Sequence, residues 1–229
     1  GFYESVQPVC AEERAYLRQH APSDADWRRN AGIAQGWGEP GYSLYERAVL
    51  RPALTVNGLT AGYQGPGGKA IIPARASAKL SFRLVPNQDP REIGQLLRRY
   101  VAHLAPATVR YQMHTRSAAR PVLIPRRHPA LAAAAHAYRQ GFAAAPVFLR
   151  SGGTIPVVDM IQRTLNTPPV LMGFALPDDN LHGPNEKLHL PVFHRGVQTS
   201  IHFLAALAPD KRCLSVRRLR PDRAKEFTS

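Results

Sequence analysis

Alternation of apolar and polar residues marks the clearest strand in the chain, residues 76–86 (ASAKLSFRLVP). Successive side chains of a strand point to opposite faces of a sheet. The apolar face here consists of Leu80, Phe82 and Leu84, and the polar face of Lys79, Ser81 and Arg83. This pattern predicts a half-buried strand that ends at Pro86, and residues 53–58 (ALTVNG) predict a preceding strand that ends in an Asn-Gly turn.

A helix and a further strand follow in the sequence. Residues 89–104 (DPREIGQLLRRYVAHL) begin with Asp89 as a helix N-cap and Pro90 at the first helical position. The apolar stripe of this helix consists of Ile93, Leu96, Leu97, Tyr100 and Leu104. Residues 107–115 (ATVRYQMHT) predict another strand. Strand, strand, helix and strand are typical of a small α+β sandwich, with helices on one face of an antiparallel sheet.

The Pro-rich stretch 118–129 (AARPVLIPRRHP) predicts a domain boundary, because the pattern changes beyond it. Helices are predicted over residues 129–143, 154–165 and 191–208, and apolar strands over residues 146–150 and 168–176. The last helix carries Phe193, Val197, Ile201 and Leu204 on one face. Alternating helices and continuous apolar strands favour part of an α/β domain with a parallel sheet covered on both faces.

The composition is that of a folded chain. With 229 residues, 44% of them hydrophobic and 20% charged, the sequence suffices for one ordinary domain or two small ones. Its formal charge of +14 raises the question of a nucleic-acid partner. Residues 211–229 contribute +5 of this charge, from seven Lys or Arg against two acidic residues. Because no nucleic-acid-binding motif accompanies the charge, we expect no nucleic-acid partner and a disordered basic tail, with a basic nucleic-acid binder as an alternative.

Cysteine usage and hydropathy bear on the location of the protein. Two cysteines, Cys10 and Cys213, give no disulfide framework, which favours a cytoplasmic protein. No apolar run approaches the roughly 18 residues of a membrane span, so we expect no membrane partner. The first residues, GFYESVQPV, lack the features of a signal peptide and an initiator Met, so we expect that an upstream segment has been removed.

The stretch RSGGTIP combines a basic residue with two glycines between a predicted strand and a predicted helix. Gly152 and Gly153 allow the backbone to approach a ligand closely. Backbone N–H groups at a helix N-terminus favour an anion such as a carboxylate, and Arg150 can bind a carboxylate through two hydrogen bonds. Thr154 is a suitable N-cap for the helix. The alternative is an ordinary strand-to-helix turn.

The stretch DDNLHGPNEKL places a histidine in a loop after an apolar strand, where α/β folds place ligand sites. His182 is a candidate metal ligand, although a lone histidine is more often structural. Asp178 and Asp179 fit ordinary loop carboxylates. Asn185 and Glu186 are candidates to orient the loop by hydrogen bonds to backbone N–H groups.

Taken together, these two motifs resemble the C-terminal part of the zinc-dependent exopeptidase family. The pattern is R-x-G-G-[ST]-I-P, followed by a histidine 28 residues after the Thr in H-x-P-N-E. The family includes carnosinases and related dipeptidases, aminoacylase, carboxypeptidase G, acetylornithine deacetylase and succinyl-diaminopimelate desuccinylase. Residues 56–90 (VNGLTAGYQGPGGKAIIPARASAKLSFRLVPNQDP) resemble the lid-domain segment of the dipeptidase branch, and GFYESVQP a stretch upstream of it. The resemblance covers residues 1–208.

The resemblance implies a fold with two parts. Residues 1–118 would be an α+β lid domain with a ferredoxin-like sandwich that forms homodimers. Residues 119–210 would be the C-terminal part of an α/β catalytic domain of the phosphorylase/hydrolase type, and residues 211–229 the basic tail. The complete parent enzyme would hold two zinc ions, and a Glu would deprotonate a metal-bound water that attacks the scissile amide.

The resemblance also implies residue roles. His182 would bind zinc, and Arg83 would reach a substrate carboxylate. The carboxylate end of the substrate site would be lined by Arg150, Gly152, Gly153 and Thr154. Asn185 and Glu186 would support the metal ligand by hydrogen bonds.

Several family motifs are absent from this chain. None of the nine histidines is followed by Asp two positions later, as in the family's first metal motif. The Glu-Glu pair at Glu12 and Glu13 lies in a predicted helix, residues 12–20, and is expected on its solvated face rather than as the family's catalytic pair. Ala70 stands where the family has Asn or Thr, which leaves the substrate open.

The parent protein is therefore expected to be a metallopeptidase for dipeptides or short peptides with a free C-terminal carboxylate. Deacylation of N-acyl amino acids is an alternative, as is a catalytically inactive dimerisation module. The chain alone is expected to bind no zinc tightly and to be inactive, because one imidazole cannot supply the three or four ligands that zinc requires.

Overall fold

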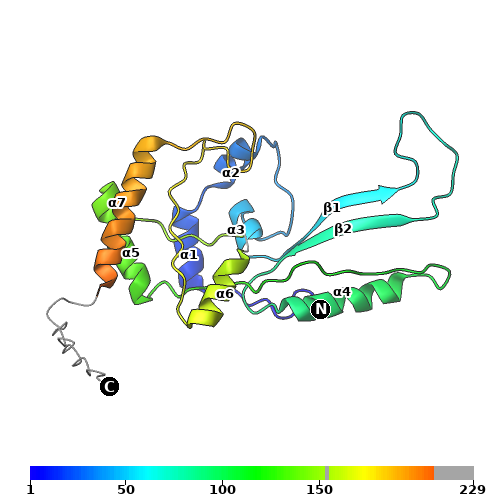
Figure 1. The fold of residues 1–229 in the computed structure, drawn as a ribbon, viewed down its shortest axis with the longest axis horizontal. Coiled ribbons are helices and arrows are strands. Elements are labelled where there is room, and N and C mark those ends of the chain that lie inside the picture. Colours follow the sequence, from blue (N-terminus) through cyan, green and yellow to red (C-terminus); the bar gives the residue numbers. More distant parts are fainter. Residues whose placement is uncertain (153–154, 209–229) are drawn as a thin grey trace, which may run out of the picture. The chain divides into compact units, whose positions relative to one another are not determined.

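The computed structural model describes residues 1–152 and 155–208. The chain forms two compact units, Gly1–Pro125 with Val147–Pro169, and Arg126–Pro146 with the chain from Val170 onward. The first unit contains α1 (Ala11–His20), α2 (Asp24–Ala31), α3 (Leu44–Val49), β1 (Ala53–Ala61), β2 (Ala76–Arg83), α4 (Pro90–Leu104) and α6 (Pro156–Leu165). The second contains α5 (Pro129–Phe142) and α7 (Leu190–Leu207) (Figure 1). The expected domain limits stay a prediction, and the basic tail lies outside the described residues.

The core of the first unit forms where α1 meets α3. Its buried residues are Leu17, Tyr45 and Leu50, with Val9, Tyr16, Ala21, Trp27 and Val49 packed around them. Helix α3 begins with a capping box, in which the Ser43 hydroxyl accepts from the Glu46 N–H and the Glu46 carboxylate accepts from the Ser43 N–H. The helix predicted over residues 12–20 is confirmed as α1.

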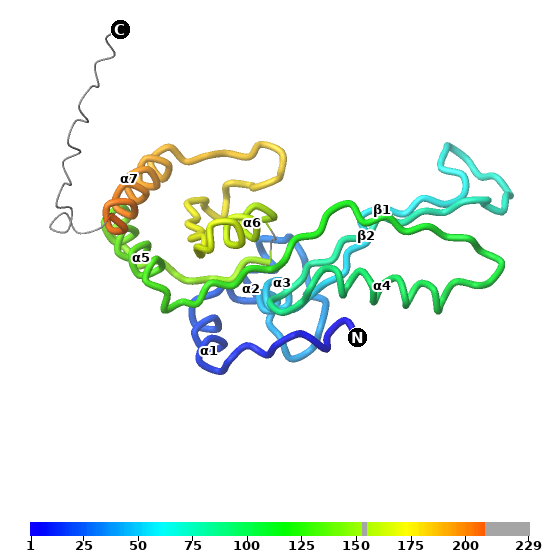
Figure 2. The backbone as a smooth tube through the Cα atoms, turned by 60° about the horizontal axis from the view of Figure 1, so that its bottom comes forward, coloured from blue at the N-terminus to red at the C-terminus, as the bar shows by residue number. Residues whose placement is uncertain are grey.

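Strands β1 and β2 form an antiparallel hairpin whose register runs from Ala53 opposite Arg83 to Ala61 opposite Ala76 (Figure 2). The predicted turn at Asn57-Gly58 is wrong, because β1 continues through both residues to Ala61. The register shifts there, between Val56 and Gly58, and glycine in a strand interior often marks such a bulge. The chain turns instead in the loop between the two strands.

The hairpin is more exposed than its alternating sequence predicts. Only Phe82 is partly buried among the residues of β2, so the prediction of a half-buried strand is wrong for most of its length. On β1, Leu54, Val56 and Leu59 are 52%, 59% and 71% exposed. Nothing in the part of the chain that the structure describes covers these apolar side chains.

Helix α4 begins as the sequence predicts. The Asp89 carboxylate accepts a hydrogen bond from the Arg91 N–H, and Pro90 is the first helical residue. Ile93 is buried at the start of the apolar stripe, whereas Tyr100 and Leu104 at its end are 62% and 60% exposed. The stripe therefore has a packing partner only in its first half.

The strand predicted over residues 107–115 is not formed. A segment with strand-forming residues becomes a strand only where a neighbouring strand pairs with its backbone. In the described sheet, β1 and β2 pair only with each other. The ferredoxin-like sandwich is consequently not confirmed.

Replacing Gly94 by Ala should stabilise α4 by up to about 1 kcal/mol, because Gly is the poorer helix former and a Cβ at this position meets no atom within 4 Å. The matched control is Gly67→Ala, which also has free space but lies at φ +77° and should destabilise the chain. Urea midpoints followed by circular dichroism at 222 nm would measure both. A lower midpoint for Gly94→Ala would contradict the packing described for α4.

The second unit is a pair of helices in close contact. A Cβ at Gly141 of α5 would lie 2.0 Å from the Thr199 Oγ1 of α7, and Thr199 is fully buried. The predicted apolar face of α7 is largely exposed, since Phe193, Val197, Ile201 and Leu204 are 46%, 45%, 61% and 67% accessible. Small residues thus bring α7 against α5, while its large apolar residues lie outside this contact.

The two apolar strands predicted beyond the boundary, residues 146–150 and 168–176, are not formed. The parallel sheet is therefore absent, and β1–β2 is the sheet found over the described ranges. The second segment instead contacts α5, where Phe174 stacks on Phe142 and the Tyr138 hydroxyl donates to the Gly173 carbonyl at 2.7 Å. A strand needs a partner strand for its backbone groups, and neither segment has one here.

None of the helices in the described ranges combines the length and the apolar character that crossing a bilayer would require.

Candidate functional site

The predicted site residues divide between the two units. Arg83, Arg150 and Gly152 lie in the first unit, where the structure brings them together. The histidine loop, with His182, Asn185 and Glu186, belongs to the second unit. The remaining candidates, Gly153 and Thr154, lie outside the described residues, and the residue that caps α6 is Ile155, without a side-chain hydrogen bond.

Arg83 is the last residue of β2 and joins that strand to the bend at Gly152, which is called the glycine turn below. Its Nη1 donates a hydrogen bond to the Gly152 carbonyl at 2.7 Å. The side chain is exposed, and no carboxylate within residues 1–152 and 155–208 forms an ion pair with it. Its remaining guanidinium N–H groups can therefore bind an incoming carboxylate.

Gly152 lies against the backbone of α3. A Cβ at this position would be 2.2 Å from the Ala48 carbonyl oxygen and 3.2 Å from the Ala48 carbonyl carbon. No side chain fits there, because real Cβ atoms do not approach backbone atoms so closely. The absence of a side chain at Gly152 is thus required by contact within the protein.

Arg150 forms a two-pronged ion pair with Glu13 of α1. Its Nε and Nη2 donate to Glu13 Oε1 and Oε2, both at 2.7 Å. The two side chains are only 17% and 21% exposed. The expectation that Glu13 lies on a solvated helix face is therefore wrong. Glu13 precedes the buried Leu17 by one helical turn, and this spacing was the signal that could have placed it inward.

The backbone of Arg150 is held by Tyr45 of α3. The Tyr45 hydroxyl accepts from the Arg150 N–H at 3.0 Å and donates to the Arg150 carbonyl at 2.8 Å. Burial raises the pKa of Tyr45 above its usual value, so the hydroxyl keeps its proton at neutral pH. Sequence reasoning missed Tyr45, because nothing local to it indicates a partner so far along the chain.

The histidine loop is fixed by Asp179. This side chain is 2% exposed, and its Oδ2 accepts from the Leu176 N–H at 2.7 Å. The Asp179 carbonyl accepts from the Lys187 N–H at 3.0 Å, which ties the two ends of the loop together. The neighbouring Asp178 pairs with the Lys187 ammonium, which lowers the pKa of that carboxyl. Asp179 is thus a structural residue of the loop rather than an ordinary solvated carboxylate.

His182 lies exposed on this loop in the left-handed region of the backbone, at φ +62°. Asn185 is exposed too and has φ +59°, a conformation that asparagine tolerates better than most residues. Glu186 is also exposed. The three candidates of this loop therefore share one short, constrained segment that ends at Lys187.

The donor set in the described residues does not form a complete metal site. Three or more His, Cys, Asp or Glu side chains do not converge on a common point anywhere in that part of the chain. Zinc requires three or four protein ligands, and His182 supplies one. Within the described residues, His182 is therefore a single candidate ligand and not part of a group of three.

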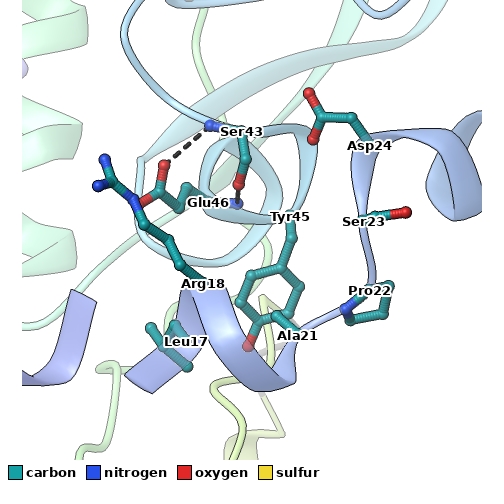
Figure 3. A pocket seen from close by; sticks show the side chains of 9 residues that line it. All are labelled: Leu17, Arg18, Ala21, Pro22, Ser23, Asp24, Ser43, Tyr45 and Glu46. Atoms are coloured by element: carbon teal, nitrogen blue, oxygen red, sulfur yellow. Dashed lines mark hydrogen bonds between the residues drawn. The ribbon is translucent and has the colours of Figure 1, made fainter. Parts of the chain in front are cut away.

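A hollow of about 130 Å³ lies near Tyr45, between α1, α2 and α3 (Figure 3). Its carboxylates already have partners: Asp24 accepts from the Leu44 N–H at 2.8 Å, and Glu46 accepts from Ser43 and Arg14. We therefore interpret this hollow as part of the packing around α3 rather than as a ligand site.

Comparison with known proteins supports the resemblance seen in the sequence. Residues 14–109 match the model of the M20 family's peptidase dimerisation domain. The chain is 24% identical over 220 residues to a Beta-Ala-His dipeptidase of Homo sapiens, covering 91% of this chain and 42% of that protein. It is 28% identical over 167 residues to a Cys-Gly metallodipeptidase of Schizosaccharomyces pombe, covering 69% and 34%. The chain thus spans less than half the length of the curated relatives that it matches.

A solved structure gives the same result. An M20 family metallo-carboxypeptidase from Sulfolobus solfataricus superposes with a TM-score of 0.78 at 26% identity, over 89% of this chain and 46% of that one. The predicted resemblance to this family is confirmed. The chain contains an M20 peptidase dimerisation domain and is homologous to the M20 metallopeptidases, close to their dipeptidase branch.

Proposed function

We propose that this chain is part of a di-zinc metallopeptidase that hydrolyses dipeptides or short peptides with a free C-terminal carboxylate. The observation that carries the proposal is Arg83, an exposed cation without a carboxylate partner in the described residues, bonded through one N–H to the glycine turn. A guanidinium in this setting can bind a carboxylate through two parallel hydrogen bonds. Relatives named as dipeptidases agree with such a substrate.

In this proposal the other candidate residues have two kinds of role, in binding the substrate carboxylate and in binding metal. Arg150, Gly152, Gly153 and Thr154 line the carboxylate end of the substrate site. His182 contributes one metal ligand, and Asn185 and Glu186 support its loop. Because one imidazole does not make a zinc site, the remaining ligands and the catalytic Glu come from outside this chain. The chain alone is then inactive and binds no zinc tightly.

We further propose a homodimer formed through residues 14–109, in a cytoplasmic protein without a nucleic-acid partner. The exposed apolar residues of β1, Leu54, Val56 and Leu59, favour self-association. They equally favour the second candidate, a dimerisation module without catalytic activity. Deacylation of N-acyl amino acids would use the same carboxylate recognition, and Ala70 supplies neither a hydroxyl nor an amide that would select between the two substrates.

The decisive measurement begins with the intact mass of the protein as its source cell makes it. We expect a mass well above the 25.2 kDa of this chain. In that longer protein, Arg83→Ala should lower kcat/KM for a dipeptide with a free carboxylate about 100-fold, which is the loss of a charge-assisted pair. The C-terminally amidated dipeptide is the control and should lose little. Equal losses on both substrates, or a dimer without activity, would contradict the proposal.

A further inference from the structure

Two tyrosine hydroxyls replace the missing strand partners of the segment before the glycine turn. The Tyr45 hydroxyl bonds both backbone groups of Arg150, at 3.0 and 2.8 Å. The Tyr16 hydroxyl accepts from the Phe148 N–H at 3.0 Å. A neighbouring strand would normally satisfy these groups, and here side chains from α1 and α3 do so.

Tyr45 is itself fixed in position. Its side chain is 4% exposed and belongs to the core cluster with Leu17 and Leu50. The Trp27 ring meets the Tyr45 ring edge to face, with centroids 6.2 Å apart. Figure 3 shows the tyrosine extending from α3 along α1, with its hydroxyl end beside Leu17 and Ala21. The hydroxyl therefore holds Arg150 relative to the core of the first unit.

Glu13 fixes the same residue through its side chain. The carboxylate binds Nε and Nη2 of Arg150 in a pair that is about four-fifths shielded from water. Such a pair neutralises the guanidinium charge and sets its orientation. Arg83 has no such neutralising partner among the described residues, so the two arginines beside the glycine turn differ in the charge that they present to a ligand.

We propose that Glu13 and Tyr45 are positioning residues for the substrate-carboxylate site. They hold Arg150, so that the chain enters the glycine turn in one conformation, and Arg83 bonds the Gly152 carbonyl from the strand side. Arg150 then contributes by fixing the position of the backbone that leads to Gly152, and Arg83 supplies the charge that binds the carboxylate. This inference rests on the proposed function and assigns separate roles to the two arginines.

The test uses the 229-residue chain with ¹⁵N label and glycylglycine as the probe. The Arg150 Nε–H resonance should exchange slowly with water and stay unchanged when glycylglycine is added, whereas the Arg83 Nε–H resonance should shift with added peptide. Tyr45→Phe and Glu13→Gln should each speed hydrogen exchange at the Arg150 amide about tenfold, the effect of one lost hydrogen bond. They should also weaken the peptide-induced shift at Arg83 several-fold. Glu4→Gln, whose side chain is 87% exposed, is the control.

A charge swap separates positioning from direct binding. The double variant Glu13→Arg, Arg150→Glu restores the ion pair with its charges exchanged. Slow hydrogen exchange at the backbone amide of position 150 and the peptide-induced shift of the Arg83 Nε–H resonance should then both return. If the swap restores slow exchange but abolishes peptide binding, or if Arg150 Nε–H itself shifts with peptide, Arg150 binds the carboxylate and the inference is overturned.

Failure of the proposed function gives a different result. No peptide-induced shift at Arg83 in any variant would count against Arg83 as the carboxylate site. The exchange rates in Tyr45→Phe, Glu13→Gln and the swap would still decide whether the two residues position Arg150.

Discussion

Gly152→Ala should destabilise the first unit by about 3 kcal/mol, the upper range for forcing an extra carbon into a packed site. The added Cβ would lie 2.2 Å from the Ala48 carbonyl oxygen. That atom belongs to the backbone of α3, so no rotation of a side chain relieves the clash. Either the turn or the helix must move, and both lie beside the core around Tyr45.

Urea unfolding followed by tryptophan fluorescence would measure the effect, since Trp27 packs on this core. The matched control is Gly68→Ala in the hairpin loop, where an added Cβ meets nothing within 4 Å and the unfolding midpoint should stay within error of the unchanged chain. If Gly152→Ala were as stable as this control, the close contact between the turn and α3 would be disproved.

The same substitution should also disturb the hydrogen bond between Arg83 and Gly152 in the proposed carboxylate site. The Gly152 carbonyl accepts from Arg83, so movement of the turn separates the strand end from the residues proposed to line the substrate. We therefore expect Gly152→Ala to reduce the peptide-induced shift of the Arg83 Nε–H resonance. The reduction should exceed the part that the unfolded fraction of this variant accounts for.

Glu46→Ala should destabilise the chain by about 2 kcal/mol, because it removes a buried carboxylate that has several partners. Its side chain is 3% exposed and accepts from Arg14 Nε at 2.6 Å, Arg14 Nη2 at 3.2 Å and the Ser43 N–H at 2.8 Å. Arg14 is 31% exposed, so water reaches it once the carboxylate is gone, which keeps the loss below that of a fully buried pair. Glu46→Gln should lose less, since the amide oxygen can still cap α3.

The stabilisation by Glu46 should depend on pH. The hydrogen bond from Arg14 holds the pKa of this carboxyl below its usual value of 4.5. A group whose pKa is lowered by folding stabilises the folded chain above its unfolded pKa, and this contribution is lost as the pH falls through the folded value. The difference in unfolding free energy between the unchanged chain and Glu46→Gln should therefore be full at pH 7 and shrink below pH 4.5.

Urea titrations at several pH values between 7 and 3 would test this dependence. Glu4→Gln is the control for general acid effects, because that side chain is 87% exposed. If the difference in unfolding free energy between the unchanged chain and Glu46→Gln stayed constant down to pH 3, the contribution of Glu46 would not depend on its charge. It would then come from hydrogen bonds and packing that the protonated side chain also makes.

The sequence by itself determined the features that depend on near neighbours. Asp89 and Pro90 start α4 as predicted, since a cap and a fixed φ angle act within one turn of the chain. Local sequence also predicts the helices α1, α5 and α7, and in α7 an apolar residue recurs at every third or fourth position. The glycine and histidine motifs, with their spacing, were enough to identify the family.

Only the tertiary structure decided which of these elements have partners. Asn57-Gly58 has the local chemistry of a turn, yet pairing with β2 makes it a bulge within the strand. Residues 107–115, 146–150 and 168–176 have the apolar character of strands, but no neighbouring strand accepts their hydrogen bonds in the described residues.

The site shows the same division. The sequence singled out Arg83, Arg150 and Gly152 as candidates, but it could not distinguish the two arginines, because each is a cation beside the same turn. The distinction comes from Glu13, which lies 137 residues from Arg150 in the chain and 2.7 Å from it in space. No local pattern encodes such a contact; it depends on α1 and α3 packing together around Tyr45 and bringing the turn against them.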